Sequence, residues 1–274
     1  MSNANHPSRP PAAARPRSLR LLVWLLLAAT IGPCAYLEAP REVSRWYLAA
    51  AQVEREAGHK ELADQQMSQA QRWSPDDPAI LLTRAKWRME DGNHSAALED
   101  CNAVDERIPQ NAAVLSLRSE VLQHLGRHEE AVADCKSLDR MSVTSGIPSR
   151  VDALNGLAYT RAVGNLELDE ALKGIEEALV MQPGDPMLLD TRGFILYRQG
   201  KHEASLTDMD PAVVGIEKLL KEPSINRRSL IKGIAVVRYH RALVLEKLGR
   251  YAEAKLDRAR AKQLIGREPD ETLF

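Results

Sequence analysis

Hydrophobic residues follow two different patterns along this chain. Residues 21–37 read LLVWLLLAATIGPCAYL and carry no charge. With Leu19 and Arg20 they make 19 residues, or about 28 Å of helix, which matches the ~30 Å of bilayer hydrocarbon. Beyond residue 38 apolar positions are spread among charged ones, and we find no convincing alternation typical of a half-buried strand. The pattern predicts a transmembrane helix over 19–37 and an all-α region over 38–274.

The flanks of the apolar run predict its orientation. Residues 1–18 form an Arg- and Pro-rich tail without an acidic residue, and we expect this tail to be disordered. The arginines that precede the run are Arg9, Arg15, Arg17 and Arg20. Charges just after the run cancel, so the positive-inside rule places the tail in the cytoplasm. We therefore expect a single-pass protein of the cell membrane whose main domain is extracytoplasmic.

Two other interpretations of this segment stay open. A cleaved signal peptide would share the Arg-rich start and the apolar core, but it requires small residues at positions −3 and −1. Cleavage after Ala35 puts Pro33 at −3, and cleavage after Ala39 puts Pro40 at +1. A lipoprotein would be modified at Cys34, but Pro33 stands where a small residue is expected. We favour the uncleaved anchor.

A period of 34 residues organises the region after the apolar run. The recurring residues are Gly58, Gly92 and Gly126, then Ala63, Ala97 and Ala131, then Pro75 and Pro109. Glycine permits a tight turn between two helices, alanine lets them approach closely, and proline ends the second helix. This pattern resembles the tetratricopeptide repeat family, in its membrane-anchored bacterial form. The resemblance implies an α-solenoid of about six helix–turn–helix repeats over residues 44–268.

The register of that family places six repeats. They start near Ser44, Pro78, Ala112, Val151, Pro186 and Ala235. The spacing stretches at 141–150 and again where Pro223 interrupts the chain, which predicts inserted loops or extra helical turns. Ser205 occupies the small-residue position of the fifth repeat. The sixth repeat ends in a Lys/Arg-rich helix that suits a capping element.

Four repeats share a charged pair at a fixed spacing. An arginine at position 7 of the family register is followed sixteen residues later by an aspartate: Arg84 with Asp100, Arg118 with Asp134, Arg192 with Asp208, and Arg241 with Asp257. Because position 7 faces the second helix of its repeat, we expect charge-assisted hydrogen bonds to the aspartate of the same or an adjacent repeat. The regular spacing favours a structural role over ligand binding. The first and fourth repeats lack the pair.

Cys101 and Cys135 directly follow the aspartate of two such pairs. They therefore occupy the same position in successive repeats, where equivalent Cα atoms lie about 10 Å apart. That distance exceeds the reach of a disulfide, about 7 Å. We expect two buried free thiols rather than a disulfide or a metal site.

No catalytic motif accompanies the repeats. The sequence contains no phosphate-binding glycine loop, H-E-x-x-H, G-x-S-x-G or C-x-x-C. Four histidines in or beside the turns are expected to be exposed polar side chains rather than metal ligands: His59, His94, His128 and His202. The balance of 37 basic and 38 acidic residues gives no reason to expect nucleic acid as a partner. We expect a protein that is not an enzyme and has no cofactor or metal.

The family resemblance also implies a binding surface, because the first helices of such repeats line the inner face of the superhelix. There the second half of the chain concentrates aromatic residues, although only 4% of all residues are aromatic. The predicted partner-binding residues are Asn155, Tyr159, Asp190, Phe194, Tyr197 and Tyr239. Aromatic anchors carry much of the energy of protein interfaces, and packing between repeats is the alternative role for these rings.

We predict a membrane-tethered scaffold that binds protein or peptide partners. The alternatives are a permanent structural or regulatory subunit of an envelope complex, and a secreted soluble repeat protein produced by signal cleavage.

Overall fold

The computed structural model describes residues 40–221 and 227–269. These residues form twelve α-helices and one short 3₁₀ helix, and they contain no strand. The prediction of an all-α repeat fold is therefore confirmed for the described part of the chain. The predicted tail, 1–18, and the predicted membrane span, 19–37, lie outside it. Within the described ranges, no helix combines the length and the apolar character needed to cross a bilayer.

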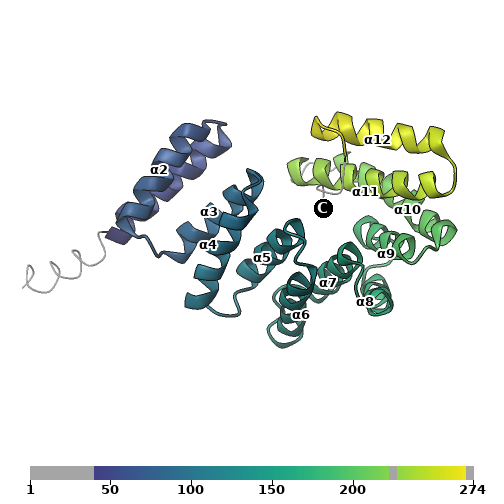
Figure 1. Cartoon of the computed structure of the whole chain (residues 1–274), viewed down its shortest axis with the longest axis horizontal. Helices are drawn as coiled ribbons and strands as arrows, with labels where there is room; N and C mark the ends of the chain where they lie inside the picture. Colours follow the sequence, from purple (N-terminus) through teal and green to yellow (C-terminus); the bar gives the residue numbers. More distant parts are fainter. Residues whose placement is uncertain (1–39, 222–226, 270–274) are drawn as a thin grey trace, which may run out of the picture. The chain divides into compact units, whose positions relative to one another are not determined.

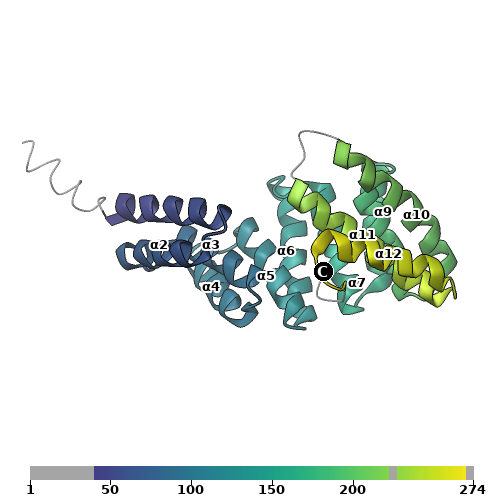
Figure 2. The same cartoon turned by 90° about the horizontal axis from the view of Figure 1, so that it is seen from above.

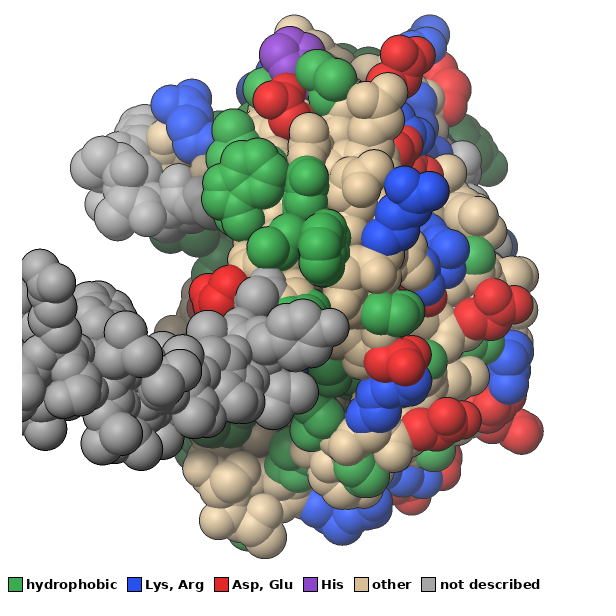
Figure 3. Space-filling model, turned by 90° about the vertical axis from the view of Figure 1, so that its left-hand side faces the viewer, with side chains coloured by type: hydrophobic (Ala, Val, Ile, Leu, Met, Phe, Trp, Pro, Cys, Tyr) green, Lys and Arg blue, Asp and Glu red, His purple; other side chains and the backbone are tan. Residues whose placement is uncertain are grey.

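The chain divides into two compact units, residues 1–80 and residues 81–274. The described part of unit 1 is a helix over residues 40–56 and α2 (Lys60–Trp73), joined by a turn in which Gly58 has a φ of +84°. The two helices bury small side chains against each other, and Ser44 Oγ donates a hydrogen bond to the Ala70 carbonyl at 3.0 Å. The exposed large hydrophobic side chains of unit 1 are Trp46, Val53, Leu62 and Trp73. Figure 3 shows hydrophobic side chains gathered on the face that it draws.

Unit 2 consists of successive helix pairs. The helices are α3 (Pro78–Glu90, which begins at the unit boundary), α4 (His94–Arg107), α5 (Ala112–His124), α6 (His128–Thr144), α7 (Arg150–Gly164), α8 (Leu168–Met181), α9 (Pro186–Arg198), α10 (His202–Lys218), η1 (Leu219–Lys221), α11 (Arg227–Lys247) and α12 (Tyr251–Ile265). The first helices of the second to fifth repeats begin at Pro78, Ala112, Arg150 and Pro186. The starts predicted from the family register therefore hold to within one residue for these four repeats.

Small residues bring the two helices of a pair together. Ala97, Ala131 and Ala171 are completely buried at the equivalent position of α4, α6 and α8. In α10 the same position holds Ser205, whose buried Oγ donates a 2.6 Å hydrogen bond to the carbonyl of Gly193 on α9. A Cβ at Gly193 would lie 2.8 Å from Met209 Cγ, so the close approach of α9 and α10 requires glycine there.

The two predicted irregularities become helical extensions. α6 and α10 have 17 residues each, whereas α4 and α8 have 14. α11 begins at Arg227 and has 21 residues, so the first helix of the sixth repeat starts before the predicted position near Ala235. The register itself holds, because Arg241 pairs with Asp257. The additional turns of α11 bury Leu230 and Ile234 in a cluster that contains Ile216 of α10. This apolar contact explains why the helix starts earlier than the period predicts; Pro223 lies outside the described residues.

The first helices of the pairs share one side of unit 2. α5 contacts α7, α7 contacts α9, and α9 contacts α11, and in Figure 1 α5, α7 and α9 follow the inner side of the arc that this unit forms, with α6 and α8 on its outer side. Figure 2 shows α11 lying across α9. Lys232 of α11 approaches Glu120 of α5 to 3.8 Å, although two helix pairs lie between them in sequence. The inner side of unit 2 is therefore enclosed by α5, α7, α9 and α11.

Candidate functional site

Each of the four arginines at position 7 donates two hydrogen bonds to the aspartate sixteen residues later. The distances from Nε and Nη2 are 2.9 and 2.5 Å for Arg84 with Asp100, 2.8 and 2.8 Å for Arg118 with Asp134, 2.7 and 2.5 Å for Arg192 with Asp208, and 2.7 and 2.9 Å for Arg241 with Asp257. All four aspartates are buried. This parallel geometry is the strong form of a charge-assisted hydrogen bond. We call these contacts the repeat ion pairs; each links the two helices of one repeat.

Asp208 shows the simplest form of this contact. It lies on α10, exposes 6% of its surface and accepts both hydrogen bonds from Arg192 of α9, within its own repeat. The expectation allowed a partner in the same or an adjacent repeat, and for Asp208 the adjacent-repeat alternative is wrong. Hydrogen bonding to Asp208, opposed by burial, raises the pKa of Arg192 above its usual value. Asp208 therefore joins the two helices of the fifth repeat.

Two repeat ion pairs also reach the preceding repeat. Arg118 Nη1 lies 2.8 Å from Asp105 of α4, and Arg241 Nη1 lies 3.0 Å from Asp210 of α10. The hydrogen bonds to Asp134, opposed by burial and reinforced by Asp105, raise the pKa of Arg118 above its usual value. The guanidinium therefore stays charged and fixes both helices.

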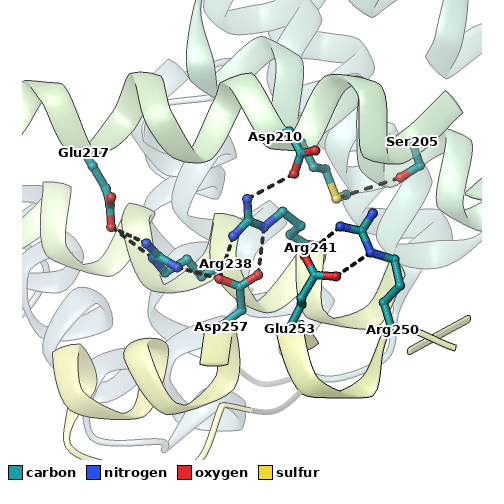
Figure 4. Close-up of polar contacts among 9 residues, drawn as sticks. Ser205, Asp210, Glu217, Arg238, Arg241, Arg250, Glu253 and Asp257 are labelled. Carbon is teal, nitrogen blue, oxygen red and sulfur yellow. Dashed lines mark hydrogen bonds and ion pairs between the residues drawn. The ribbon is translucent and has the colours of Figure 1, made fainter. Parts of the chain in front are cut away.

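Arg238 is a member of this network that sequence reasoning missed. It donates to Asp257 at 2.5 Å and to Glu217 of α10 at 3.0 and 2.7 Å. Figure 4 shows the Asp257 carboxylate held between Arg238 and Arg241. Arg238 precedes Arg241 by three residues, which places both on one face of α11. That spacing is the sequence signal that could have identified it.

Cys101 and Cys135 are buried free thiols, as predicted. Burial, together with the negative charge of Asp100, raises the pKa of Cys101 to about 12. Burial likewise raises the pKa of Cys135, whose Sγ lies 3.4 Å from Thr160 Oγ1. Because the thiolate is the reactive form, neither side chain is arranged for nucleophilic chemistry in the folded protein.

Three of the four turn histidines differ from the expectation of simple exposure, whereas His59 is exposed as expected. His94, His128 and His202 are the first residues of α4, α6 and α10, and each has its Nδ1 atom buried. The His94 ring stacks on His124 of α5 with centroids 4.5 Å apart. Burial, and then the nearby charges, lower the pKa of His124. These rings pack at junctions between helices, and in the described part of the chain no group of three or more His, Cys, Asp or Glu side chains is placed to hold a metal.

Three of the predicted partner-binding residues are buried. Asp190, Phe194 and Tyr239 expose 2%, 3% and 4% of their surface. Phe194 stacks on His240 of α11 with centroids 4.3 Å apart, and the Tyr159 and Tyr197 rings lie 6.0 and 6.1 Å from Phe194. For Phe194 and Tyr239 the expectation of direct partner contact is therefore corrected. The Phe194 ring packs against His240 of the following repeat, and the Arg258 guanidinium of α12 lies over the Tyr239 ring, 5.1 Å from its centroid. Tyr197 is half-buried beside Phe194.

Three of the six predicted residues, the buried Asp190 among them, meet at one cavity. Asn155 and Tyr159 of α7 and Asp190 of α9 line a space of about 290 Å³ that α11 closes from the opposite side. Gly156 and Val236 belong to its walls. The cavity therefore lies where three consecutive first helices meet, and we call it the α7–α9–α11 cavity. The sequence placed these residues on one face, and the structure brings them to one space.

A buried polar pair lies beside this cavity. Nδ1 of His240, which is completely buried, is 3.0 and 2.9 Å from the two carboxylate oxygens of Asp190. Burial, then the charges of Asp190 and Glu120, raises the pKa of Tyr159 well above its usual value, so its phenol stays protonated. Asn155 Oδ1 is buried without a hydrogen-bond partner. His240 was missed by sequence reasoning, because the irregular spacing before the sixth repeat hides its register relative to Asp190.

Comparisons with known proteins agree with the repeat fold. A scan against models of protein families finds no match. A stretch of 54 residues, 20% of this chain, is 44% identical to the TPR repeat-containing protein PA4667 of Pseudomonas aeruginosa, and the match spans only 9% of that relative's length.

Solved structures extend the likeness to most of the chain. A tetratricopeptide repeat protein from Parabacteroides merdae superposes with a TM-score of 0.64 at 19% identity, over 81% of this chain and 78% of that chain. PilW, a widely conserved type IV pilus biogenesis factor, gives 0.58 at 14% identity, over 81% and 93%. PilF of Pseudomonas aeruginosa gives 0.54 at 16% identity, over 83% and 94%. The chain is thus a tetratricopeptide-like repeat protein in its fold.

Proposed function

We propose that this chain is a membrane-tethered scaffold that binds a segment of a protein partner along the inner side of unit 2. The observation that carries the proposal is the α7–α9–α11 cavity, which lies on the side shared by the first helices of consecutive repeats. Concave, mostly apolar spaces with a few polar groups are the usual sites of recognition. The proposal involves no catalytic step, cofactor or nucleic acid.

The tether is the part of the proposal that rests on sequence. Residues 19–37 would form the transmembrane anchor, residues 1–18 a cytoplasmic tail and residues 38–274 the extracytoplasmic repeat domain. The likeness in fold to PilW, a type IV pilus biogenesis factor, is consistent with a role in assembling other proteins. A permanent subunit of an envelope complex and a secreted soluble form are the alternative arrangements.

Site-specific photo-crosslinking in cells tests partner binding. Lys232 is exposed at the cavity, and Lys173 is exposed on α8, so a photoreactive residue can replace either lysine. We expect a crosslinked protein partner from position 232 and none from position 173. Equal products from both positions, or none from position 232, would contradict inner-side binding.

Fractionation of the same cells tests the tether. The full chain should remain with the membrane after alkaline carbonate washing, and a chain lacking residues 1–37 should not. A full chain released by the wash, with a shortened N-terminus by mass spectrometry, would support the secreted alternative. A single stoichiometric, salt-resistant partner would favour the permanent subunit.

A further inference from the structure

Two polar groups of the α7–α9–α11 cavity, on Asp190 and Asn155, keep the capacity to accept hydrogen bonds. The Asp190 carboxylate exposes only 2% of its surface, and its hydrogen bonds come from one ring nitrogen of His240. A carboxylate offers about four acceptor positions, so it retains the capacity to accept further hydrogen bonds. The Asn155 Oδ1 atom accepts none. A ligand that donates hydrogen bonds would satisfy both groups, and burial makes an unsatisfied group costly.

The charge of the cavity favours a cation. Asp190 lines the cavity with Tyr159, and Glu120 of α5 lies just outside it, close to the lining residue Lys232. The cation among the lining residues is Lys232, whose side chain is 55% exposed and whose ammonium lies 3.8 Å from Glu120. Lys232 is therefore directed towards α5 rather than towards Asp190. The face of a tyrosine ring also attracts a cation.

The size and walls of the cavity fit a single long side chain. At about 290 Å³ it lies at the lower limit of small-molecule pockets, which measure roughly 300–1,000 Å³. Tyr159 and Val236 supply apolar wall, and Gly156 leaves open space where a side chain would stand. Lysine combines an apolar four-carbon stem with a terminal group that carries three N–H donors.

We propose that the α7–α9–α11 cavity receives a basic side chain, a lysine, from the protein segment that binds unit 2. Its ammonium donates hydrogen bonds to Asp190 and Asn155, and its stem lies against Tyr159 and Val236. This inference rests on the proposed function and specifies the chemistry of the partner that the same site selects.

Capped pentapeptides test this chemistry on the purified full chain in detergent. The central residue is lysine, norleucine, arginine or glutamate, with alanine at the other positions, and affinity is measured by calorimetric titration. Because a hydrogen bond to a charged group is at stake, the lysine peptide should bind roughly tenfold or more tightly than the norleucine peptide. The arginine peptide should be the next best ligand, and the glutamate peptide should not bind. Equal binding of lysine and norleucine, or preference for glutamate, overturns the inference.

Variants of the lining residues locate the effect. Asn155→Asp adds a carboxylate and should raise the affinity for the lysine peptide, whereas Asn155→Ala should lower it. Lys232→Glu should also raise that affinity, because it replaces a like charge at the cavity. Lys173→Glu makes the same change of net charge on α8 and should have no effect. Equal effects of Lys232→Glu and Lys173→Glu would reduce the selectivity to general electrostatics and overturn the inference.

The outcomes separate this inference from the function on which it rests. A crosslink from position 232 together with equal lysine and norleucine affinities would leave inner-side binding intact and reject the basic side chain. Selective lysine binding without a crosslink from position 232 would support the cavity chemistry and reject the scaffold function.

Discussion

The third and fourth repeats use different side chains at the same two equivalent positions. In α5/α6, Arg118 bonds Asp134 of its own repeat and Asp105 of the preceding one. In α7/α8 the corresponding positions hold Leu157 and Lys173. Leu157 is buried against Val132 and Cys135 of α6, and Lys173 is exposed. A repeat ion pair in the third repeat is thus replaced by a buried apolar side chain in the fourth.

This difference shows which features are architecture and which distinguish one repeat. The repeat ion pairs recur wherever the 34-residue register carries arginine and aspartate, so they serve the helix pair itself. The α7 helix lacks the pair, and its opposite face carries Asn155, Gly156 and Tyr159 at the cavity. Substitutions at the repeat ion pairs should therefore change the free energy of unfolding, whereas substitutions at the cavity should change partner binding.

The largest effect is expected from Asp257→Ala in the last repeat. Asp257 is 1% exposed and accepts hydrogen bonds from both Arg238 and Arg241. Its loss leaves two partly buried guanidinium groups without their shared partner and should lower the free energy of unfolding by about 3–5 kcal/mol. Urea denaturation measures this change.

Asp210→Ala is the matched control, because Asp210 also pairs with Arg241 but is 56% exposed. Its cost should be about 0–1 kcal/mol. Similar costs at the two aspartates would show that burial does not decide the strength of these contacts.

Leu157→Ala tests the apolar version of the same position. Leu157 is 6% exposed, and its truncation should cost about 3 kcal/mol by loss of burial and formation of a cavity. The same denaturation experiment applies, with Leu256→Ala as a control because that side chain is 70% exposed. A cost below that of the control would mean that α7 does not depend on this contact.

A double-mutant cycle on Arg118→Ala and Asp134→Ala measures the pairing in the third repeat. The two groups make parallel hydrogen bonds of 2.8 Å, so their coupling free energy should be about 1–2 kcal/mol. Strictly additive losses of unfolding free energy would show that the two side chains do not stabilise each other.

The thiol that follows the aspartate of the second repeat gives an effect that is confined to alkaline solution. The pKa of Cys101 is about 12 in the folded protein and about 8.5 in an unfolded chain. Because the folded value is the higher one, the stabilisation is complete below the unfolded pKa and is lost as pH rises towards the folded one. Between pH 8.5 and about 11, Cys101→Ala should therefore show a shallower fall of melting temperature than the unmodified chain. Equal slopes would indicate that Cys101 ionises normally in the fold.

The period in the sequence predicted the repeat boundaries and the pairing partners because both depend on local spacing. The positions of the turn glycines, of the small residues and of the paired Arg and Asp residues all depend on contacts within one helix pair. The start of α11 could not be predicted in this way: α10 is extended to Lys218, and α11 packs Leu230 and Ile234 against it. Such a contact depends on the extra length of two helices, which a fixed sequence spacing cannot predict.

The candidate site was predicted only in part for a related reason. The register gives the side of a helix on which a residue lies, and it brought Asn155, Tyr159 and Asp190 to the right side. The register does not show how deeply a side chain is buried. Phe194 is covered by His240 of the following repeat, and their alignment depends on the irregular spacing between α10 and α11. Burial of an aromatic side chain between repeats is a tertiary property that the period cannot report.

The most direct test of inner-side binding fills the α7–α9–α11 cavity without disturbing the fold. A Cβ at Gly156 would meet no atom within 4 Å, so Gly156→Leu should place its side chain in the cavity, while Gly156→Ala leaves most of the space open. The account predicts that Gly156→Leu loses the partner crosslinked from position 232, that Gly156→Ala retains it, and that both variants melt at or above the temperature of the unmodified chain. Undiminished crosslinking by a correctly folded Gly156→Leu chain would contradict it.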